Sequence, residues 1–292
     1  MKFIFSFLIP FLLLLGLIYV LVSAYAIYSV THPTVSAESI DPSSYFIHFE
    51  GFTYKTKDTL SLPGWFGAAK PSAPVIILCH GYGETRSKIL GLADKLHGAG
   101  FSVVLPLLRG HSADRGATTL GWLESDDLLS MVEELKRQKW LQAQKLGAWG
   151  MNTGTFTILA AFQKGLPLKA VAVDTPFLSV QDYLNFRLRQ FVADQEIFRP
   201  WLTNHLFTTL ILRNPMVDTP ALNVNAWKEH PKVLVITTLT EKGPSQKASQ
   251  MLAAFPDTKV WKIAATRQEE LSGPMLDAYD QEVVRFFQQV SW

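Results

Sequence analysis

The stretch from Lys145 to Gln163, KLGAWGMNTGTFTILAAFQ, decides the fold of this chain. A short apolar run ends in a turn of sequence GMNTG, Gly150 to Gly154, and a long apolar segment follows it. This order predicts a strand, a sharp turn and a helix, with small residues flanking one side chain that projects above a sheet. Such an elbow ordinarily presents a serine nucleophile. Here the central residue is Asn152, whose amide has no hydroxyl or thiol to activate.

Alternating strands and helices are expected on both sides of this elbow. An antiparallel hairpin is predicted over Tyr45 to Lys55 and Leu60 to Phe66. Apolar runs then predict strands, and apolar residues at helical spacing predict helices between them. The strands are expected at 75–79, 102–106, 170–173, 233–238 and 259–263, and the helices around 89–96, 128–135, 248–255 and 283–290. This alternation is typical of an α/β fold, a doubly wound and mostly parallel sheet with helices on both faces.

The segment 177–230 interrupts the alternation. It is too long for a plain connection, and aromatic residues with interspersed arginines run through it. We expect it to form helices of its own and to act as a helical cap over the carboxyl edge of the sheet, where ligands bind in such folds. Its aromatic side chains are expected to form the core of the cap rather than a cage around a ligand.

The N-terminus predicts one transmembrane helix. No charged residue occurs from Phe3 to Val30, a run long enough to cross a bilayer. Lys2 and the amino terminus are the only positive charges before it, so a single-pass anchor would place the rest of the chain on the extracytoplasmic side. A cleaved signal peptide and a secreted protein remain the alternative, because Ala24-Tyr25-Ala26 has the small-x-small pattern of a cleavage site.

The expected domain organisation follows from this segment. Residues 1–30 form the anchor or an uncleaved signal, 31–44 are a linker rich in Ser, Thr and Pro, and 45–292 are one folded domain with 177–230 as its cap. A domain of this size buries a large core.

Composition excludes several classes of function. Of 292 residues 48% are hydrophobic and the formal net charge is +2, which argues against disorder and against nucleic acid as a partner. Cys79 is the single cysteine, so no internal disulfide forms. The histidines lack metal-ligand spacing, and Arg86 stands where a dinucleotide-binding motif beginning at Gly81 needs its third glycine. We therefore expect no metal and no cofactor.

Four motifs, taken in order, resemble those of the α/β-hydrolase superfamily, and the likeness extends from Tyr45 to the end of the chain. Within the superfamily, the chain resembles the bacterial single-domain hydrolases related to prolyl-oligopeptidase-type and esterase-type proteins. The motifs are HGYG at 80–83, RGHS at 109–112, the elbow GMNTG at 150–154 and DTPF at 174–177. The resemblance implies an oxyanion hole made by the backbone N–H groups of Tyr82 and Thr153. An equal alternative is that the glycines there only form tight turns. Candidates to line a pocket are His80, Gly81, His111 and Met151.

The other two positions of the implied catalytic triad are degenerate. Glu241 falls at the position of the acid, although it fits a solvated surface charge equally well. Gln268 falls at the position of the histidine, and no histidine follows His230. A glutamine cannot accept the proton that a nucleophile must lose. In serine hydrolases, loss of the triad lowers turnover about a millionfold.

Three interpretations remain open at this point. The first is a membrane-anchored protein that has lost conventional serine-hydrolase catalysis and binds an unknown small-molecule ligand or protein partner. The second is an unorthodox hydrolase of ester, amide or lipid substrates at the membrane surface, with His80, His111 or Glu241 as its base. The third is a purely structural module for binding a partner, which a cap filled by its own aromatic side chains would favour.

Overall fold

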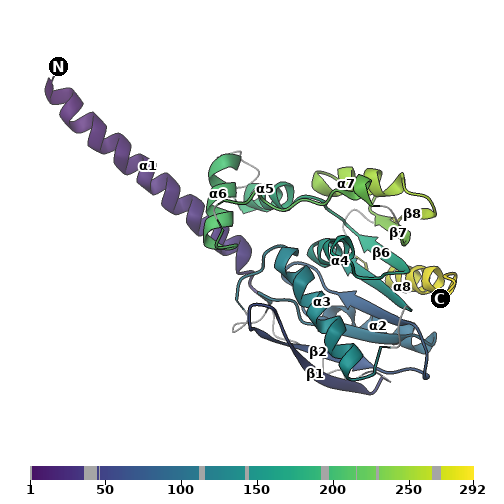
Figure 1. Cartoon of the computed structure of the whole chain (residues 1–292). Helices are drawn as coiled ribbons and strands as arrows, with labels where there is room; N and C mark the ends of the chain where they lie inside the picture. Colours follow the sequence, from purple (N-terminus) through teal and green to yellow (C-terminus); the bar gives the residue numbers. More distant parts are fainter. Residues whose placement is uncertain are drawn as a thin grey trace.

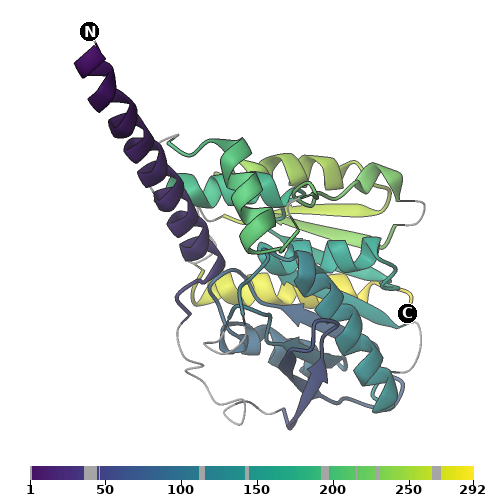
Figure 2. The same cartoon turned by 60° about the vertical axis from the view of Figure 1, so that its left-hand side comes forward.

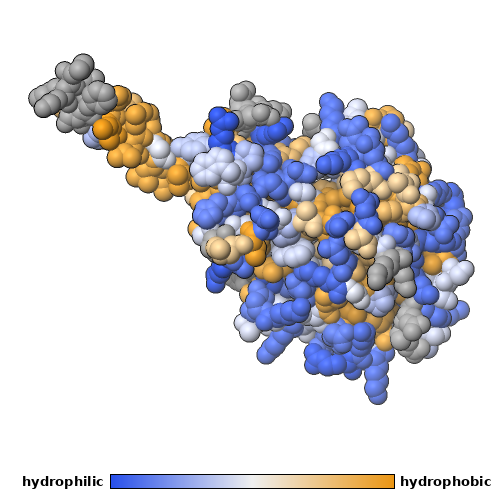
Figure 3. All heavy atoms as spheres, turned by 45° about the horizontal axis from the view of Figure 1, so that its top comes forward, coloured by the Kyte–Doolittle hydropathy of each residue, from blue (hydrophilic) through white to orange (hydrophobic). Residues whose placement is uncertain are grey.

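The computed structural model describes residues 2–35, 45, 47–111, 116–141, 145–191, 197–214, 216–227, 230–264 and 271–292. A long helix, α1 (Lys2–Thr31), projects from a body in which helices cover a central sheet (Figures 1 and 2). The surface of the projecting part of α1 is hydrophobic, and hydrophilic residues cover much of the body around its foot (Figure 3). α1 is long and apolar enough to cross a membrane, and its place at the N-terminus also fits a signal sequence.

The described strands form one eight-stranded sheet in the order β1-β2-β4-β3-β5-β6-β7-β8. The first two strands form the expected hairpin, β2 pairs antiparallel with β4, and the remaining pairs are parallel. The strands are β1 (Phe49–Lys55), β2 (Ser61–Gly67), β3 (Val75–Cys79), β4 (Ser102–Pro106), β5 (Leu146–Met151), β6 (Ala170–Asp174), β7 (Lys232–Thr237) and β8 (Thr258–Lys262). The α/β fold with a doubly wound, mostly parallel sheet is confirmed.

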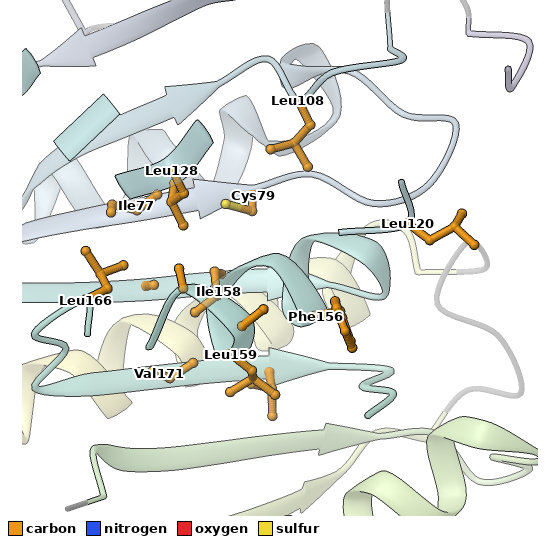
Figure 4. Close-up of a cluster of buried hydrophobic side chains, with 14 of the residues drawn as sticks. Ile77, Cys79, Leu108, Leu120, Leu128, Phe156, Ile158, Leu159, Leu166 and Val171 are labelled. Atoms are coloured by element: carbon orange, nitrogen blue, oxygen red, sulfur yellow. The ribbon is translucent and has the colours of Figure 1, made fainter. Parts of the chain in front are cut away.

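Helices cover the sheet on both faces. On one face lie α3 (Trp122–Arg137) and α4 (Thr153–Gln163), and on the other lie α2 (Leu90–Gly98) and α8 (Pro274–Gln288). Every residue of β3, β4 and β6 is buried, which explains their continuous apolar runs. Figure 4 shows part of the core between the sheet and the α3 and α4 side. Cys79 belongs to this core, where burial raises the pKa of its thiol, so it acts as a small hydrophobic residue.

The described residues between β6 and β7 include two helices, in line with the expectation that this segment forms helices of its own. They are α5 (Val180–Phe191) and α6 (Pro200–Leu210), and a short 3-10 helix, η3 (Val224–Ala226), follows them. Phe177, Tyr183 and Phe207 are buried, whereas the side chains of Phe191 and Trp201 are exposed. The aromatic residues of this segment therefore divide between its core and its surface. The remaining elements are the 3-10 helix η2 (Arg86–Ile89) and α7 (Pro244–Ala253).

The last turns of α1 pack into the folded body. Ala26 and Ile27 have no exposed surface, and Val30 is 4% exposed. The carbonyl of Thr31 accepts a hydrogen bond from the N–H of Thr118 at 2.9 Å. By contrast, the apolar side chains from position 7 to position 22 are exposed. α1 thus consists of an exposed apolar part and a docked end. Most of the linker expected at 31–44 lies outside the described residues.

Candidate functional site

The sheet brings the loops after β3 and β5 together. These strands are parallel neighbours, with Cys79 paired to Gly150. The chain proceeds to one side of this pair through β4 and to the other through β6, so the strand order reverses here. In doubly wound folds such a switch point opens a space at the carboxyl ends of the strands, and ligands bind there. The HGYG loop and the elbow therefore meet, as expected for a hydrolase-like site.

The elbow has the sharp geometry that its sequence predicts. Asn152 lies at φ 36° and ψ −101°, a region that costs a residue other than glycine about 1–3 kcal/mol. Its N–H donates to the carbonyl of Asp174 on the neighbouring strand at 2.9 Å. A Cβ on Gly154 would lie 2.3 Å from the carbonyl oxygen of Cys79. The strained turn is therefore held by the strand beside it and by a close approach that only glycine permits.

The side chain of Asn152 fills the expected oxyanion hole. Its Oδ1 accepts hydrogen bonds from the backbone N–H of Tyr82 at 2.7 Å and of Thr153 at 2.6 Å. Only the amide oxygen can satisfy two N–H donors, which fixes the orientation of the carboxamide. The two donors are the pair that the hydrolase resemblance implies. They form an anion cradle, and the protein's own amide oxygen lies where a substrate oxyanion would be stabilised.

The residues beside the cradle pack closely on this amide. A Cβ on Gly81 would lie 3.0 Å from Nδ2 of Asn152 and 3.0 Å from Cε of Met151. Gly81 and Met151, two of the pocket-lining candidates, therefore do adjoin Asn152. The side chain of Asn152 is itself half-buried rather than sealed from solvent.

The two histidines near the site brace its loops. Nε2 of His80 accepts from the N–H of Leu108 at 3.1 Å, and Nε2 of His111 accepts from the N–H of Gly83 at 3.2 Å. Each Nδ1 therefore carries the proton, and it donates to a backbone carbonyl, that of Gly81 or of Arg109. Burial lowers the pKa of both rings. Both rings are buried, and all four ring nitrogens have structural partners.

Acidification is expected to destabilise the fold through these two rings. Since their folded pKa values are depressed, the unfolded chain binds more protons once the pH falls below about 6.5. Each ring then removes up to about 1.4 kcal/mol of unfolding free energy per pH unit, whereas above about pH 6.5 neither contributes. We expect His111→Gln, whose amide oxygen can still accept from Gly83, to lose less stability than the wild type between about pH 7 and about pH 5.5.

Urea unfolding of the full chain in detergent measures this difference. The matched control is His205→Gln, because His205 is exposed on α6. An equal loss of stability on acidification in His111→Gln and in the wild type would show that the buried ring does not carry the effect.

The predicted acid, Glu241, binds hydroxyl groups of α7. Oε1 of Glu241 accepts hydrogen bonds from the hydroxyls of Ser245, at 2.5 Å, and Ser249, at 3.2 Å. Both serines belong to α7, so the half-buried carboxylate fastens the start of that helix. Burial raises its pKa. Gln268, at the position of the histidine, lies outside the described residues.

Sequence reasoning missed a buried polar chain beneath the elbow. The indole N–H of Trp149 donates to the hydroxyl of Tyr279 at 3.0 Å, and that hydroxyl donates to Oδ2 of Asp174 at 2.5 Å. Burial, with the neighbouring carboxylate, raises the pKa of the Tyr279 phenol, so the phenol keeps its proton. Asp174 is fully buried at the end of β6. A charged residue that ends a continuous apolar strand was the available signal.

Aromatic rings fill the space between the elbow helix and the cap. Phe177 stacks on Phe156 of α4, with ring centroids 4.9 Å apart, and on Tyr183 of α5 at 4.2 Å. Tyr183 also meets Tyr82 edge-on at 6.3 Å, and the guanidinium of Arg187 lies 4.1 Å from the centre of the Tyr82 ring. The cap is thus packed onto the cradle loop by its own side chains.

No group of three or more His, Cys, Asp or Glu residues that could hold a metal occurs within the described ranges. Charged side chains near the site instead pair with one another. Arg109 of the RGHS motif binds the carboxylates of Asp58 and Asp127 through two hydrogen bonds each. This guanidinium therefore has a structural role.

Comparison with known proteins agrees with this architecture. The model of the prolyl oligopeptidase family matches residues 93–259, more than half of the chain. An uncharacterized protein of Mycobacterium tuberculosis is 28% identical over 153 residues, which are 51% of this chain and 52% of that protein. An uncharacterized 31.7 kDa protein of Escherichia coli, from the traX-finO intergenic region, is 25% identical over 107 residues, 36% of this chain and 37% of that one. The matched region thus spans about half or less of these relatives.

Solved structures of hydrolases share the fold. An esterase of Pyrococcus furiosus superposes with a TM-score of 0.68 at 18% identity, covering 90% of this chain and 99% of that one. An acylaminoacyl peptidase of Pyrococcus horikoshii gives a TM-score of 0.56 at 19% identity, covering 83% of this chain and 42% of that one.

Proposed function

Because this chain belongs to the prolyl oligopeptidase family, we propose that it is a membrane-anchored member that lacks conventional serine-hydrolase activity and serves to bind a ligand or a protein partner. The observation that carries the proposal is the hydrogen bonding of Oδ1 of Asn152 to both donors of the anion cradle. A hydrolase needs that cradle empty, so that it can receive the developing negative charge of the substrate.

The chemistry of the side chains supports the same conclusion. An amide at the elbow supplies no electron pair that can form an acyl-enzyme near neutral pH. General base catalysis requires a side chain with a free proton acceptor within hydrogen-bonding reach of the reacting group. The acceptor nitrogens of His80 and His111 bind backbone N–H groups, and Glu241 binds the serines of α7. The alternative of an unorthodox hydrolase is therefore the weaker one.

The packing of the cap favours a partner over a small ligand. The Phe156, Phe177 and Tyr183 stack joins α4 to α5, so the protein's own side chains fill the space between the elbow helix and the cap. A protein partner would bind the outside of the cap and the rim of the site instead. The partially accessible Asn152 amide lies at that rim.

Reactivity of the full chain in detergent tests the proposal. We expect the wild type and Asn152→Ala to hydrolyse no chromogenic ester above background and to resist a fluorophosphonate probe. The matched variant Asn152→Ser vacates the cradle and supplies a hydroxyl, so slow labelling by the phosphonate in this variant alone is expected. Ester turnover by the wild type that disappears in Asn152→Ala would overturn the proposal.

We also propose that α1 is retained and spans the membrane. Cleavage after Ala26 would remove Ser23 and Ala26, which are fully buried against the folded body. The docked end of α1 therefore supports an anchor over a cleaved signal peptide. The charge distribution around α1 supports an extracytoplasmic body, as argued from Lys2.

A further inference from the structure

A group of exposed side chains marks the edge of the cap nearest to α1. Phe191 ends α5, and Ile197, Arg199 and Trp201 lie just before and within the start of α6. The exposed fractions are 47% for Phe191, 51% for Ile197 and 70% for Trp201. We call these four residues the cap edge. Three large exposed apolar side chains at the end of α5 and the start of α6 indicate a surface that contacts another molecule.

The cap edge is hydrogen-bonded to the exposed apolar part of α1. The hydroxyl of Tyr19 donates to the carbonyl of Ile197 at 3.1 Å and accepts from the N–H of Arg199 at 2.9 Å. Further along the helix, Tyr25 meets Phe191 edge-on, with ring centroids 6.4 Å apart. Figures 1 and 2 both show α6 alongside the lower half of α1. The apolar surface of α1 and the cap edge are therefore continuous.

The position of these contacts along α1 sets the depth of the cap edge. The hydrocarbon core of a bilayer is spanned by about 20 helical residues. The exposed apolar part of α1 ends at Val22, before the buried Ser23. Tyr19 lies three residues inside that end, about 4.5 Å at 1.5 Å per residue. A helix that spans with this segment brings Ile197 and Arg199 to the level of the membrane interface.

The chemistry of the cap edge fits that level. Trp and Tyr concentrate at the two interfaces of membrane proteins, where an apolar ring and a polar group are both satisfied. Arg199 can reach lipid phosphates while Trp201 and Ile197 enter the upper acyl chains. The tyrosines of α1 at 19, 25 and 28 occur in the same zone.

We propose that the cap edge lies in the interface of the bilayer that holds α1, so that the body rests on the membrane surface. This inference rests on the proposed anchoring by α1. It assigns the bilayer as the binding partner of a second surface of the protein, the cap edge. The site would then face the membrane closely. The phenol of Tyr82, a cradle residue, donates to the carbonyl of Val30, only eight residues, about 12 Å, beyond Val22.

Depth-dependent quenching in vesicles tests the proposal with the full chain. Cys79 is buried, so an environment-sensitive maleimide dye is directed to one introduced cysteine, with the unmodified chain as the labelling blank. The variants are Trp201→Cys at the cap edge, Leu13→Cys in the middle of the exposed apolar part of α1, and Lys136→Cys near the C-terminal end of α3. The vesicles are phosphatidylcholine with a spin label either at the headgroup or deep in the acyl chain.

The expected pattern separates the two proposals. The dye at Leu13 should lose most of its fluorescence to the deep quencher, the dye at Trp201 to the headgroup quencher, and the dye at Lys136 should keep nearly all of it with both. Quenching at Leu13 without quenching at Trp201 would overturn the cap-edge proposal and leave the anchor intact. No quenching at Leu13 would overturn the anchor.

A second labelling position controls for a local effect of the substitution at Trp201. Ile197→Cys is expected to give the same headgroup quenching, because both side chains belong to the cap edge. If instead a second copy of the chain covers this surface, both dyes will resist the lipid quencher and show energy transfer between molecules that rises with protein density. That result would replace the bilayer by a self-interface and overturn the proposal.

Discussion

Gly154→Ala is expected to prevent stable folding of the body, at a cost of more than about 4 kcal/mol. The added Cβ would lie 2.3 Å from the carbonyl oxygen of Cys79 and 2.6 Å from that of His80. Both atoms are backbone, and Cys79 ends the central strand β3, where it pairs with Gly150 of β5. Neither side can move without breaking the sheet. Thermal unfolding of the full chain in detergent, or its failure to yield folded protein, measures the effect.

Gly91→Ala is the matched control for this change. Gly91 lies within α2, and a Cβ there meets no atom within 4 Å. Because alanine restricts the unfolded chain and favours helix, the substitution is expected to raise the unfolding free energy by about 0.5–1 kcal/mol. A Gly154→Ala protein with the same melting temperature as the wild type would mean that the elbow does not have the close approach described above.

The elbow and the sheet could be predicted because their determinants are local in the sequence. Small residues at 150 and 154, on either side of one exposed position, predict a sharp turn whatever residue stands in the middle. Continuous apolar runs bounded by turn residues predict buried parallel strands. The strand positions expected for β3 and β4 agree with the structure residue for residue. These features depend on backbone geometry and on burial, and both can be inferred from the residue types.

The state of the site could not be predicted in the same way. The sequence shows that Asn152 cannot be a nucleophile, but its χ angles decide whether the amide points to solvent or into the cradle. The roles of His80 and His111 likewise depend on which backbone N–H groups lie opposite their Nε2 atoms. Such partners are about 28 residues away along the chain, and only the folded sheet brings them together.

The division of α1 was hidden for a different reason. A helix that is apolar on all sides has no periodicity to separate a face that contacts protein from a face that contacts lipid. The sequence therefore predicts one uniform span from Phe3 to Val30. The structure shows that the residues after Val22 begin to dock, with Ser23 and Ala26 fully buried. Polar Ser23 and Thr31, which lie at the two ends of the docked part, are a compositional signal of this division.

Ile27→Ala is expected to lower the unfolding free energy of the body by about 3 kcal/mol, although Ile27 belongs to the N-terminal apolar run. Its side chain has no exposed surface and joins the core cluster that also contains Phe177 and Tyr183. Truncation leaves a cavity in this cluster, and the loss is expected as a lower melting temperature in detergent, which solvates the exposed part of α1. The matched control is Leu21→Ala, since Leu21 is 59% exposed and should leave the melting temperature unchanged. Equal melting temperatures for the two variants would indicate that α1 is a passive tether. The expected difference would make α1 a structural part of the candidate site, because the hydrogen bond from the phenol of Tyr82 to the carbonyl of Val30 connects the two.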